Sequence, residues 1–189
     1  MMKLPIGLSN KHIHLSKEDV QKLFGEEYEL KEFKPLSQPG QYACEEKVDL
    51  VGPKGTIKGV RVLGPTRPDT QVEISLADCF TLGVKAPIKE SGDIEGTPGV
   101  KLVGPNGEVE IQRGVIVASR HIHMNLEDAE KFGVKDKDIV SVKTFGQRAL
   151  IFENVLVRAR KDFALEMHVD VEEGNAAGVR NGDLVELIK

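Results

Sequence analysis

Along most of the chain, hydrophobic and polar residues alternate in short runs, the pattern of half-buried β-strands. Glycine, proline and asparagine separate these runs at turns such as Gly52-Pro53 and Asn106-Gly107. The predicted strand regions are 48–52, 55–64, 70–76, 100–104, 108–124, 138–145, 149–159, 164–171 and 183–188. The pattern predicts a mainly β protein of small, barrel-like architecture.

Helical signals are few and short. Segments 16–25, 125–133 and 170–178 each begin with a capping residue and end in glycine, so we predict a short helix in each. Segments 26–47 and 87–99 are rich in charges and contain prolines and glycines, so they are interpreted as surface connections, either of which could serve as a lid.

Composition narrows the class of protein. The 189 residues are 40% hydrophobic and 30% charged, which suits one domain or two small ones. A net charge of -4 gives no broad basic field, so nucleic acid and anionic membranes are poor candidate partners. With no leader pattern and no apolar run near the roughly 20 residues of a membrane helix, a cytoplasmic protein is expected. Cys44 and Cys79 indicate neither a disulfide framework nor a zinc knuckle, and Cys79 is interpreted as a buried apolar residue.

The five histidines gather in three short places. They are His12 and His14, His121 and His123, and His168. Two residues apart on a strand, side chains project from the same face, so each extended His-Ile-His run offers a pair of imidazoles. Random placement would give about 0.1 such pairs. The alternative is that the rings only satisfy a polar core, but the paired pattern favours metal binding.

An internal duplication supplies a third candidate ligand for each pair. Segment 9–25 matches 119–133, and 60–84 matches 155–179 without a gap, which aligns Glu73 with His168. Segment 48–55 also echoes 100–107, at a different offset. Three ligands with an open position are typical of catalytic zinc, although cobalt, iron and nickel accept the same donors. The alternative for Glu73 is a solvated strand residue. The predicted ligand sets are His12, His14 and Glu73, and His121, His123 and His168.

Arg67 is a candidate anion-binding residue. It lies six residues before Glu73 in a turn bounded by prolines, where its guanidinium can form paired hydrogen bonds to phosphate or carboxylate. An ordinary surface arginine is the alternative. The aligned residue of the second half is Asp162, and this asymmetry favours one shared site with a single anion pocket.

In order along the chain, "SNKHIHL", "GPTRPDTQVEISLADC", "ASRHIHM" and "MHVD" resemble the propanediol-utilisation phosphotransacylase family, the phosphate propanoyltransferases. The resemblance spans almost the whole chain. It implies two β-barrels related by duplication, with two zinc ions in a cleft between them. One barrel would be 11–118, and the other would combine 119–189 with the N-terminal strand 1–10. The implied activity is reversible acyl transfer between coenzyme A and inorganic phosphate, from propanoyl-CoA or acetyl-CoA.

The resemblance also implies roles for individual residues. The first ligand set would hold a zinc ion that takes the CoA sulfur, the second would hold a zinc ion beside water or phosphate, and Arg67 would bind phosphate. Phe80 would bound the acyl pocket. The CoA site would be lined by Ser9, Lys34, Arg61, Leu63, His168 and Asn175.

Two further expectations concern the cell and the assembly. Family members in microcompartments carry an N-terminal extension, whereas eleven residues precede His12 here, which indicates a cytosolic form or a chain trimmed of its extension. Exposed β-edges are compatible with a homodimer.

The residues alone leave other functions open. Ser75 and Cys79 lack the organised base of a covalent nucleophile, so direct attack by phosphate is the predicted mechanism. A dinuclear metallohydrolase is the enzymatic alternative, because two metals can also activate water. A barrel-type module that senses metal or an anion is the non-enzymatic one. Phosphate dependence of CoA release distinguishes the two enzymes, and a binding module would take up its ligand stoichiometrically without turnover.

Overall fold

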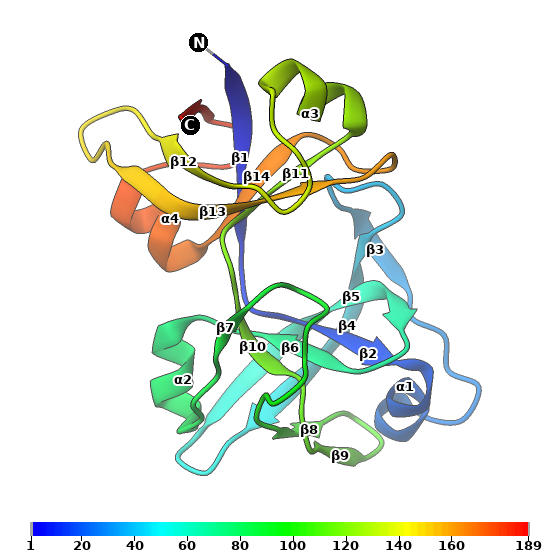
Figure 1. Cartoon of the computed structure of the whole chain (residues 1–189). Coiled ribbons are helices and arrows are strands. Elements are labelled where there is room, and N and C mark those ends of the chain that lie inside the picture. Colours follow the sequence, from blue (N-terminus) through cyan, green and yellow to red (C-terminus); the bar gives the residue numbers. More distant parts are fainter. Residues whose placement is uncertain (1, 189) are drawn as a thin grey trace. The chain divides into compact units, whose positions relative to one another are not determined.

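The computed structural model describes residues 2–188, which form two compact units (Figure 1). Unit 1 comprises Met1–Asn10, Ser37–Pro39 and Ser119–Lys189, and unit 2 comprises Lys11–Leu36 and Gly40–Ala118. Both are built mainly from strands, so the prediction of a mainly β, barrel-like fold is confirmed.

Unit 1 is a closed barrel whose strands follow the order β1-β14-β11-β13-β12-β15. Its strands are β1 (Lys3–Ser9), β11 (His121–Met124), β12 (Ile139–Lys143), β13 (Ile151–Ala159), β14 (Glu166–Asp170) and β15 (Leu184–Ile188). Helices α3 (Leu126–Phe132) and α4 (Val171–Ala177) follow β11 and β14 directly. The antiparallel pairing of β1 with β15 closes the barrel, so β1, β11 and β14 have no free edge.

Unit 2 is a curled half-barrel sheet in the order β7-β10-β6-β2-β5-β4-β8-β9, with β3 paired to β4. Its strands are β2 (His12–Ser16), β3 (Glu32–Pro35), β4 (Tyr42–Val51), β5 (Thr56–Arg67), β6 (Gln71–Glu73), β7 (Ile88–Lys89), β8 (Val100–Val103), β9 (Glu108–Ile111) and β10 (Val115–Ala118). Helices α1 (Lys17–Phe24) and α2 (Leu76–Leu82) follow β2 and β6.

Each unit has its own hydrophobic core, and each core contains the isoleucine of a His-Ile-His run. Ile122 is fully buried with Met124, Val157 and their neighbours in unit 1, and Ile13 is fully buried in unit 2. Burial of one such side chain stabilises the fold by roughly 1.5–3 kcal/mol. Because side chains alternate across a strand, packing the isoleucine inward turns both flanking histidines to the other face.

The duplication is visible in the strand pairing. β2 pairs with β5 in parallel and with β6 antiparallel, and β11 pairs in the same way with β13 and β14. The strand that precedes each His-Ile-His run lies in the other unit: β1 precedes β2 but pairs with β14 of unit 1, and β10 precedes β11 but pairs with β6 of unit 2. Each unit therefore takes its ligand strands from one repeat and a flanking strand from the other.

The echo between 48–55 and 100–107 has a local cause. β4 and β8 are antiparallel neighbours. The turn that follows each of these strands donates a backbone hydrogen bond to the C-terminal end of a helix. Lys54 N donates to Leu82 O of α2, and Asn106 N donates to Leu23 O of α1, both at 3.0 Å. A Cβ at Gly52 would lie 2.2 Å from Leu82 O, so the close approach requires glycine. This repeat within unit 2 caps two helices and is separate from the larger duplication.

The secondary structure confirms the three predicted helices as α1, α3 and α4 and corrects other predictions. The predicted strand 70–76 ends at Glu73, because Ser75 and Asp78 form a capping box, each side chain accepting a hydrogen bond from the other's backbone N–H, that starts α2. Segment 26–47, interpreted as a surface connection, contains β3 and the start of β4, with Cys44 buried. Segment 87–99 contains β7.

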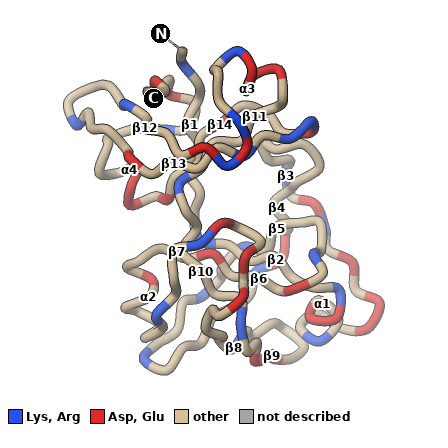
Figure 2. Tube along the Cα trace, in the orientation of Figure 1, with Lys and Arg blue, Asp and Glu red and all other residues tan. Residues whose placement is uncertain are grey.

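Charge is mixed over the surface. Lys and Arg are interspersed with Asp and Glu along each unit (Figure 2), in keeping with the absence of a broad basic field in the sequence. Among the described residues, no helix is both long and apolar enough to span a membrane.

Candidate functional site

In unit 1, the imidazoles of His121, His123 and His168 form a cluster that we call the three-histidine group. Register places His121 on β11 directly opposite His168 on β14. His168 Nδ1 lies 3.1 Å from His123 Nδ1 and 3.3 Å from His121 Nε2. Nitrogens bound to one tetrahedral zinc ion lie about 3.3 Å apart, given Zn–N bonds of about 2.0–2.1 Å. These separations therefore fit a metal ion of that size.

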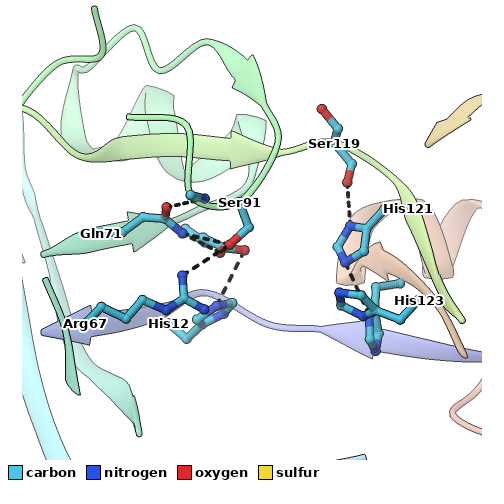
Figure 3. Close-up of polar contacts among 10 residues, drawn as sticks. His12, Arg67, Gln71, Ser91, Ser119, His121 and His123 are labelled. Carbon is cyan, nitrogen blue, oxygen red and sulfur yellow. Dashed lines mark hydrogen bonds and ion pairs between the residues drawn. The ribbon is translucent and has the colours of Figure 1, made fainter. Parts of the chain in front are cut away.

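Hydrogen bonds on the far side of two rings orient them. His121 Nδ1 lies 2.8 Å from the carbonyl oxygen of Ser119, and His168 Nε2 lies 2.6 Å from Glu166 Oε2 (Figure 3 shows the Ser119–His121 contact). The ring of Phe163 packs edge-on against His123, with centroids 4.4 Å apart. A carbonyl or carboxylate that accepts one N–H leaves the other ring nitrogen free to bind metal.

In unit 2, the side chains of His12, His14 and Glu73 form the second cluster, the His–Glu group. All three are buried, and His12 Nε2 lies 3.5 Å from Glu73 Oε2. His14 hydrogen-bonds the backbone of Leu63. Within the described part of the chain, its buried Nδ1 has no hydrogen-bond partner. A buried lone pair without a donor is costly, and a metal ion would satisfy it.

The pKa shifts of His14 and Glu73 favour the metal-binding form of each of these two side chains. Burial, with the charges of His12 and Arg67, lowers the pKa of His14 to about 3. Burial raises the pKa of Glu73, but the charges of His12 and His14 and hydrogen bonds from His12 and Ser91 outweigh this and hold it well below its usual range. A neutral imidazole and an ionised carboxylate are the forms that bind metal.

Two side chains, Gln71 and Ser91, hydrogen-bond Glu73, and Arg67 contacts Ser91 (Figure 3 labels these three residues). Gln71 Nε2 donates to Glu73 Oε1 at 2.7 Å, and Ser91 Oγ donates to the same oxygen at 2.6 Å. Arg67 Nη1 lies 3.3 Å from Ser91 Oγ. This places the predicted anion-binding arginine beside the His–Glu group. Sequence reasoning missed Ser91, because it lies in a segment that carries no strand or motif signal.

The basic residue before each His-Ile-His run has the same role in both units. Lys11 Nζ lies 3.1 Å from Asp78 Oδ1, and Arg120 Nε lies 2.8 Å from Glu173 Oε1. Asp78 and Glu173 complete the capping boxes of α2 and α4, the helices that follow the third-ligand strands. Each ion pair therefore ties the paired histidines to the strand that carries the third ligand.

The remaining predicted residues lie on several elements. Arg61 and Leu63 are on β5, directly opposite His12 and His14, and Arg61 Nη1 donates to Cys44 O at 2.7 Å. The others are Ser9 at the end of β1 and exposed Asn175 on α4 in unit 1, and exposed Lys34 on β3 and Phe80 on α2, 83% exposed, in unit 2.

Comparison with known proteins gives consistent matches. A family model described as phosphate propanoyltransferase matches residues 5–180, a range that contains both ligand groups. A phosphate propanoyltransferase of Thermotoga maritima is 59% identical over 185 residues, covering 97% of this chain and 88% of the relative. The Clostridioides difficile protein of the same name is 55% identical over 186 residues, covering 98% and 89%. That of Listeria monocytogenes is 52% identical over 184 residues, covering 97% and 86%.

Proposed function

The chain belongs to the phosphate propanoyltransferase family, and on this premise we propose that it transfers a short acyl group reversibly between coenzyme A and inorganic phosphate using two zinc ions. Family membership makes the chain a phosphotransacylase, with an acyl-CoA and phosphate as substrates. Propanoyl-CoA and acetyl-CoA are the proposed acyl donors.

The observation that carries the zinc proposal is the pair of three-donor groups. Each combines imidazole or carboxylate donors whose ligand atoms lie within 4.8 Å of one another. Three protein ligands leave a fourth position for substrate. His12, His14 and Glu73 would hold one zinc ion, and His121, His123 and His168 the other. Zinc bound there supplies Lewis acidity, which stabilises a thiolate sulfur or a phosphate oxygen.

Arg67 supplies the fixed positive charge of the reaction. It lies beside the His–Glu group, and its planar guanidinium suits two oxygens of one phosphate. A phosphate oxygen attacks the thioester carbonyl, the new carbon–oxygen bond forms, and the carbon–sulfur bond breaks to release CoA as a thiolate. Holding phosphate in place makes this attack effectively unimolecular and offsets the developing negative charge.

We extend the proposal to the rest of the substrate. Lys34 and Arg61 supply positive charge for the CoA phosphates, and Ser9, Leu63, His168 and Asn175 complete that site. The exposed ring of Phe80 bounds the acyl group. Segments 11–118 and 119–189 with 1–10 are the proposed domains, and the cytoplasm is the proposed location.

The test is release of CoA from propanoyl-CoA and acetyl-CoA, with and without phosphate, on protein of measured metal content. We expect release that depends on phosphate, stops on chelation and returns with zinc. The more efficient donor identifies the acyl preference. Release without phosphate would replace the proposal with a hydrolase, and no release from zinc-loaded protein would leave a binding role.

A further inference from the structure

Glu166 is a carboxylate beside the three-histidine group that the proposed reaction does not use. It lies two residues before His168 on β14, on the same face of the strand, and directly opposite His123 on β11. Its Oε2 atom is 2.6 Å from His168 Nε2. This carboxylate therefore touches one proposed ligand on the side facing away from the other two.

The contact selects one form of the His168 ring. A neutral imidazole carries a single N–H, and a carboxylate oxygen within hydrogen-bond distance accepts it. With the proton on Nε2, the lone pair is on Nδ1. That atom is the one that lies 3.1 Å and 3.3 Å from the ligand nitrogens of His123 and His121.

Glu166 is itself held by Ser37 on one side and has room for its side chain at Gly7 on the other. Ser37 Oγ donates a hydrogen bond to Oε2 of Glu166, and the next residue, Gln38, anchors the Ser37 segment. Buried Gln38 pairs with both backbone groups of Ala164, donating to its oxygen at 3.0 Å and accepting from its nitrogen at 3.2 Å. On the other side, a Cβ at Gly7 would lie 2.9 Å from Glu166 Cδ and Oε1. Only glycine there leaves room for the Glu166 side chain in this position.

The His–Glu group has the opposite arrangement at the equivalent positions. Gln71 lies two residues before Glu73 on β6 and donates its amide N–H to Glu73 Oε1. Where β1 has Gly7 opposite His168, β10 has Ile116 opposite Glu73. One group therefore has a carboxylate ligand supported by an amide, and the other has an imidazole ligand supported by a carboxylate. Counted with its supporting residue, each set therefore contains one carboxylate, as a ligand in the His–Glu group and behind a ligand in the three-histidine group.

We propose that Glu166 is the positioning residue of the three-histidine group and that it holds His168 with Nδ1 directed at the metal, while Ser37 holds Glu166 and Gly7 leaves room for its side chain. The inference rests on the proposed function, because it assumes that this group binds zinc. Outer carboxylates of this kind typically contribute 10–100-fold to metal affinity. Removal of the Glu166 carboxylate should weaken zinc binding at this group alone.

The first test determines the tautomer of the His168 imidazole in the absence of metal. Nitrogen–proton correlation NMR on the full-length, zinc-free protein at mildly alkaline pH reports which nitrogen of His168 carries the proton. We expect Nε2–H in the unmodified protein and a mixture of both tautomers in Glu166→Ala. A proton on Nδ1 in the unmodified protein, or the same single tautomer in the variant, would overturn the positioning role.

The second test measures zinc affinity by competition with a chromophoric chelator. The unmodified protein should bind two zinc ions, and Glu166→Ala should weaken one of them by about 10–100-fold while the other is unchanged. Glu166→Gln, which keeps an acceptor oxygen but loses the charge, should lose less. Gly7→Ala should displace Glu166 and weaken the same site, and Glu153→Gln on the exposed part of β13 is the matched control.

The outcomes separate this inference from the proposed function. If the unmodified protein binds two zinc ions and all three variants bind them equally well, the role of Glu166 is wrong and the zinc proposal stands. If the unmodified protein binds no zinc, the zinc proposal fails and this inference fails with it. Circular dichroism identifies any variant that does not fold, and the remaining variants then decide.

Discussion

The three-histidine group and the His–Glu group use the same strand framework with different chemistry. In both units, a His-Ile-His strand lies between a parallel strand and an antiparallel strand that carries the third donor. The third donor is His168 in one unit and Glu73 in the other, and the residue two positions earlier changes from Glu166 to Gln71. A duplicated fold can thus keep its ligand geometry while the carboxylate is a proposed metal ligand in one unit and the residue that supports a ligand in the other.

A second difference concerns the anion. Arg67 lies beside Ser91 near the His–Glu group, and the alignment gives the other repeat Asp162 at that position. Only the His–Glu group therefore gains a guanidinium from this position of the repeat. We infer that the two groups have unequal tasks, although their strand registers are equivalent.

The strongest way to break the comparison is to remove one ligand from each group. His12→Ala and His121→Ala should each lose one zinc ion and lower turnover by more than about 10³-fold, above the usual effect of losing one hydrogen-bond donor to a transition state. Metal analysis of each purified variant, combined with phosphate-dependent CoA release, checks this. Normal activity in either variant with one zinc ion missing would show that this group is not needed for the reaction.

The anion asymmetry is tested at Arg67. Arg67→Ala should lower kcat/KM for phosphate by about 10²–10³-fold, with a higher phosphate KM, because the guanidinium binds phosphate and balances charge in the transition state. Arg67→Lys should recover part of the loss, since a point charge cannot form the paired hydrogen bonds. Arg113→Ala, an exposed arginine on the surface of unit 2, is the control. An unchanged phosphate KM in Arg67→Ala would place the anion elsewhere.

Moving the carboxylate of the His–Glu group from the ligand position, Glu73, to the supporting position, Gln71, sharpens the comparison further. Glu73→His should weaken zinc binding at the His–Glu group by about 10–100-fold, because the amide of Gln71 then supports an imidazole in place of the carboxylate. The additional substitution Gln71→Glu would restore the arrangement of the other unit and recover much of the affinity. Zinc competition titrations of the single and double variants measure this. A double variant weaker than the single one would show that the two frameworks are not interchangeable.

The last expected effect concerns neither turnover nor zinc affinity: it is a pH dependence of stability specific to the His–Glu group. His14 has a folded-state pKa of about 3 against an ordinary 6.5, so below pH 6.5 the unfolded chain takes up a proton that the folded chain does not. The zinc-free protein should therefore lose stability as pH falls from 6.5 toward 3, by up to about 1.4 kcal/mol per pH unit from this residue. Urea unfolding of the unmodified protein and His14→Leu should show a shallower slope in the variant. Equal slopes would contradict the burial of a neutral His14.

Much of this arrangement could be predicted from the sequence. The spacing of the histidines predicts an extended strand with Ile13 or Ile122 packed inward, and the ungapped alignment matches Glu73 with His168. The strand registers then place Glu73 opposite His12 and His168 opposite His121. Both inferences depend on local periodicity and on duplication, which one sequence contains.

The supporting residues could not be predicted in this way. Ser37 and Ser91 reach their carboxylates from segments without strand periodicity, through contacts between residues far apart in the chain. Glu166 looks like an ordinary polar residue of an alternating strand, and its role becomes visible only when the ring of His168 is placed. Helix α2 was missed because its capping box follows directly on a strand-like run, where the short signal at Ser75 is easily read as more strand.

X-ray diffraction at the zinc absorption edge, on crystals of protein purified with zinc, tests the central claim most directly. Two anomalous peaks per chain are predicted, one bounded by His121, His123 and His168 and the other by His12, His14 and Glu73. A single peak, or none in crystals of protein that shows phosphate-dependent CoA release, would contradict the account of two zinc ions held by duplicated ligand groups.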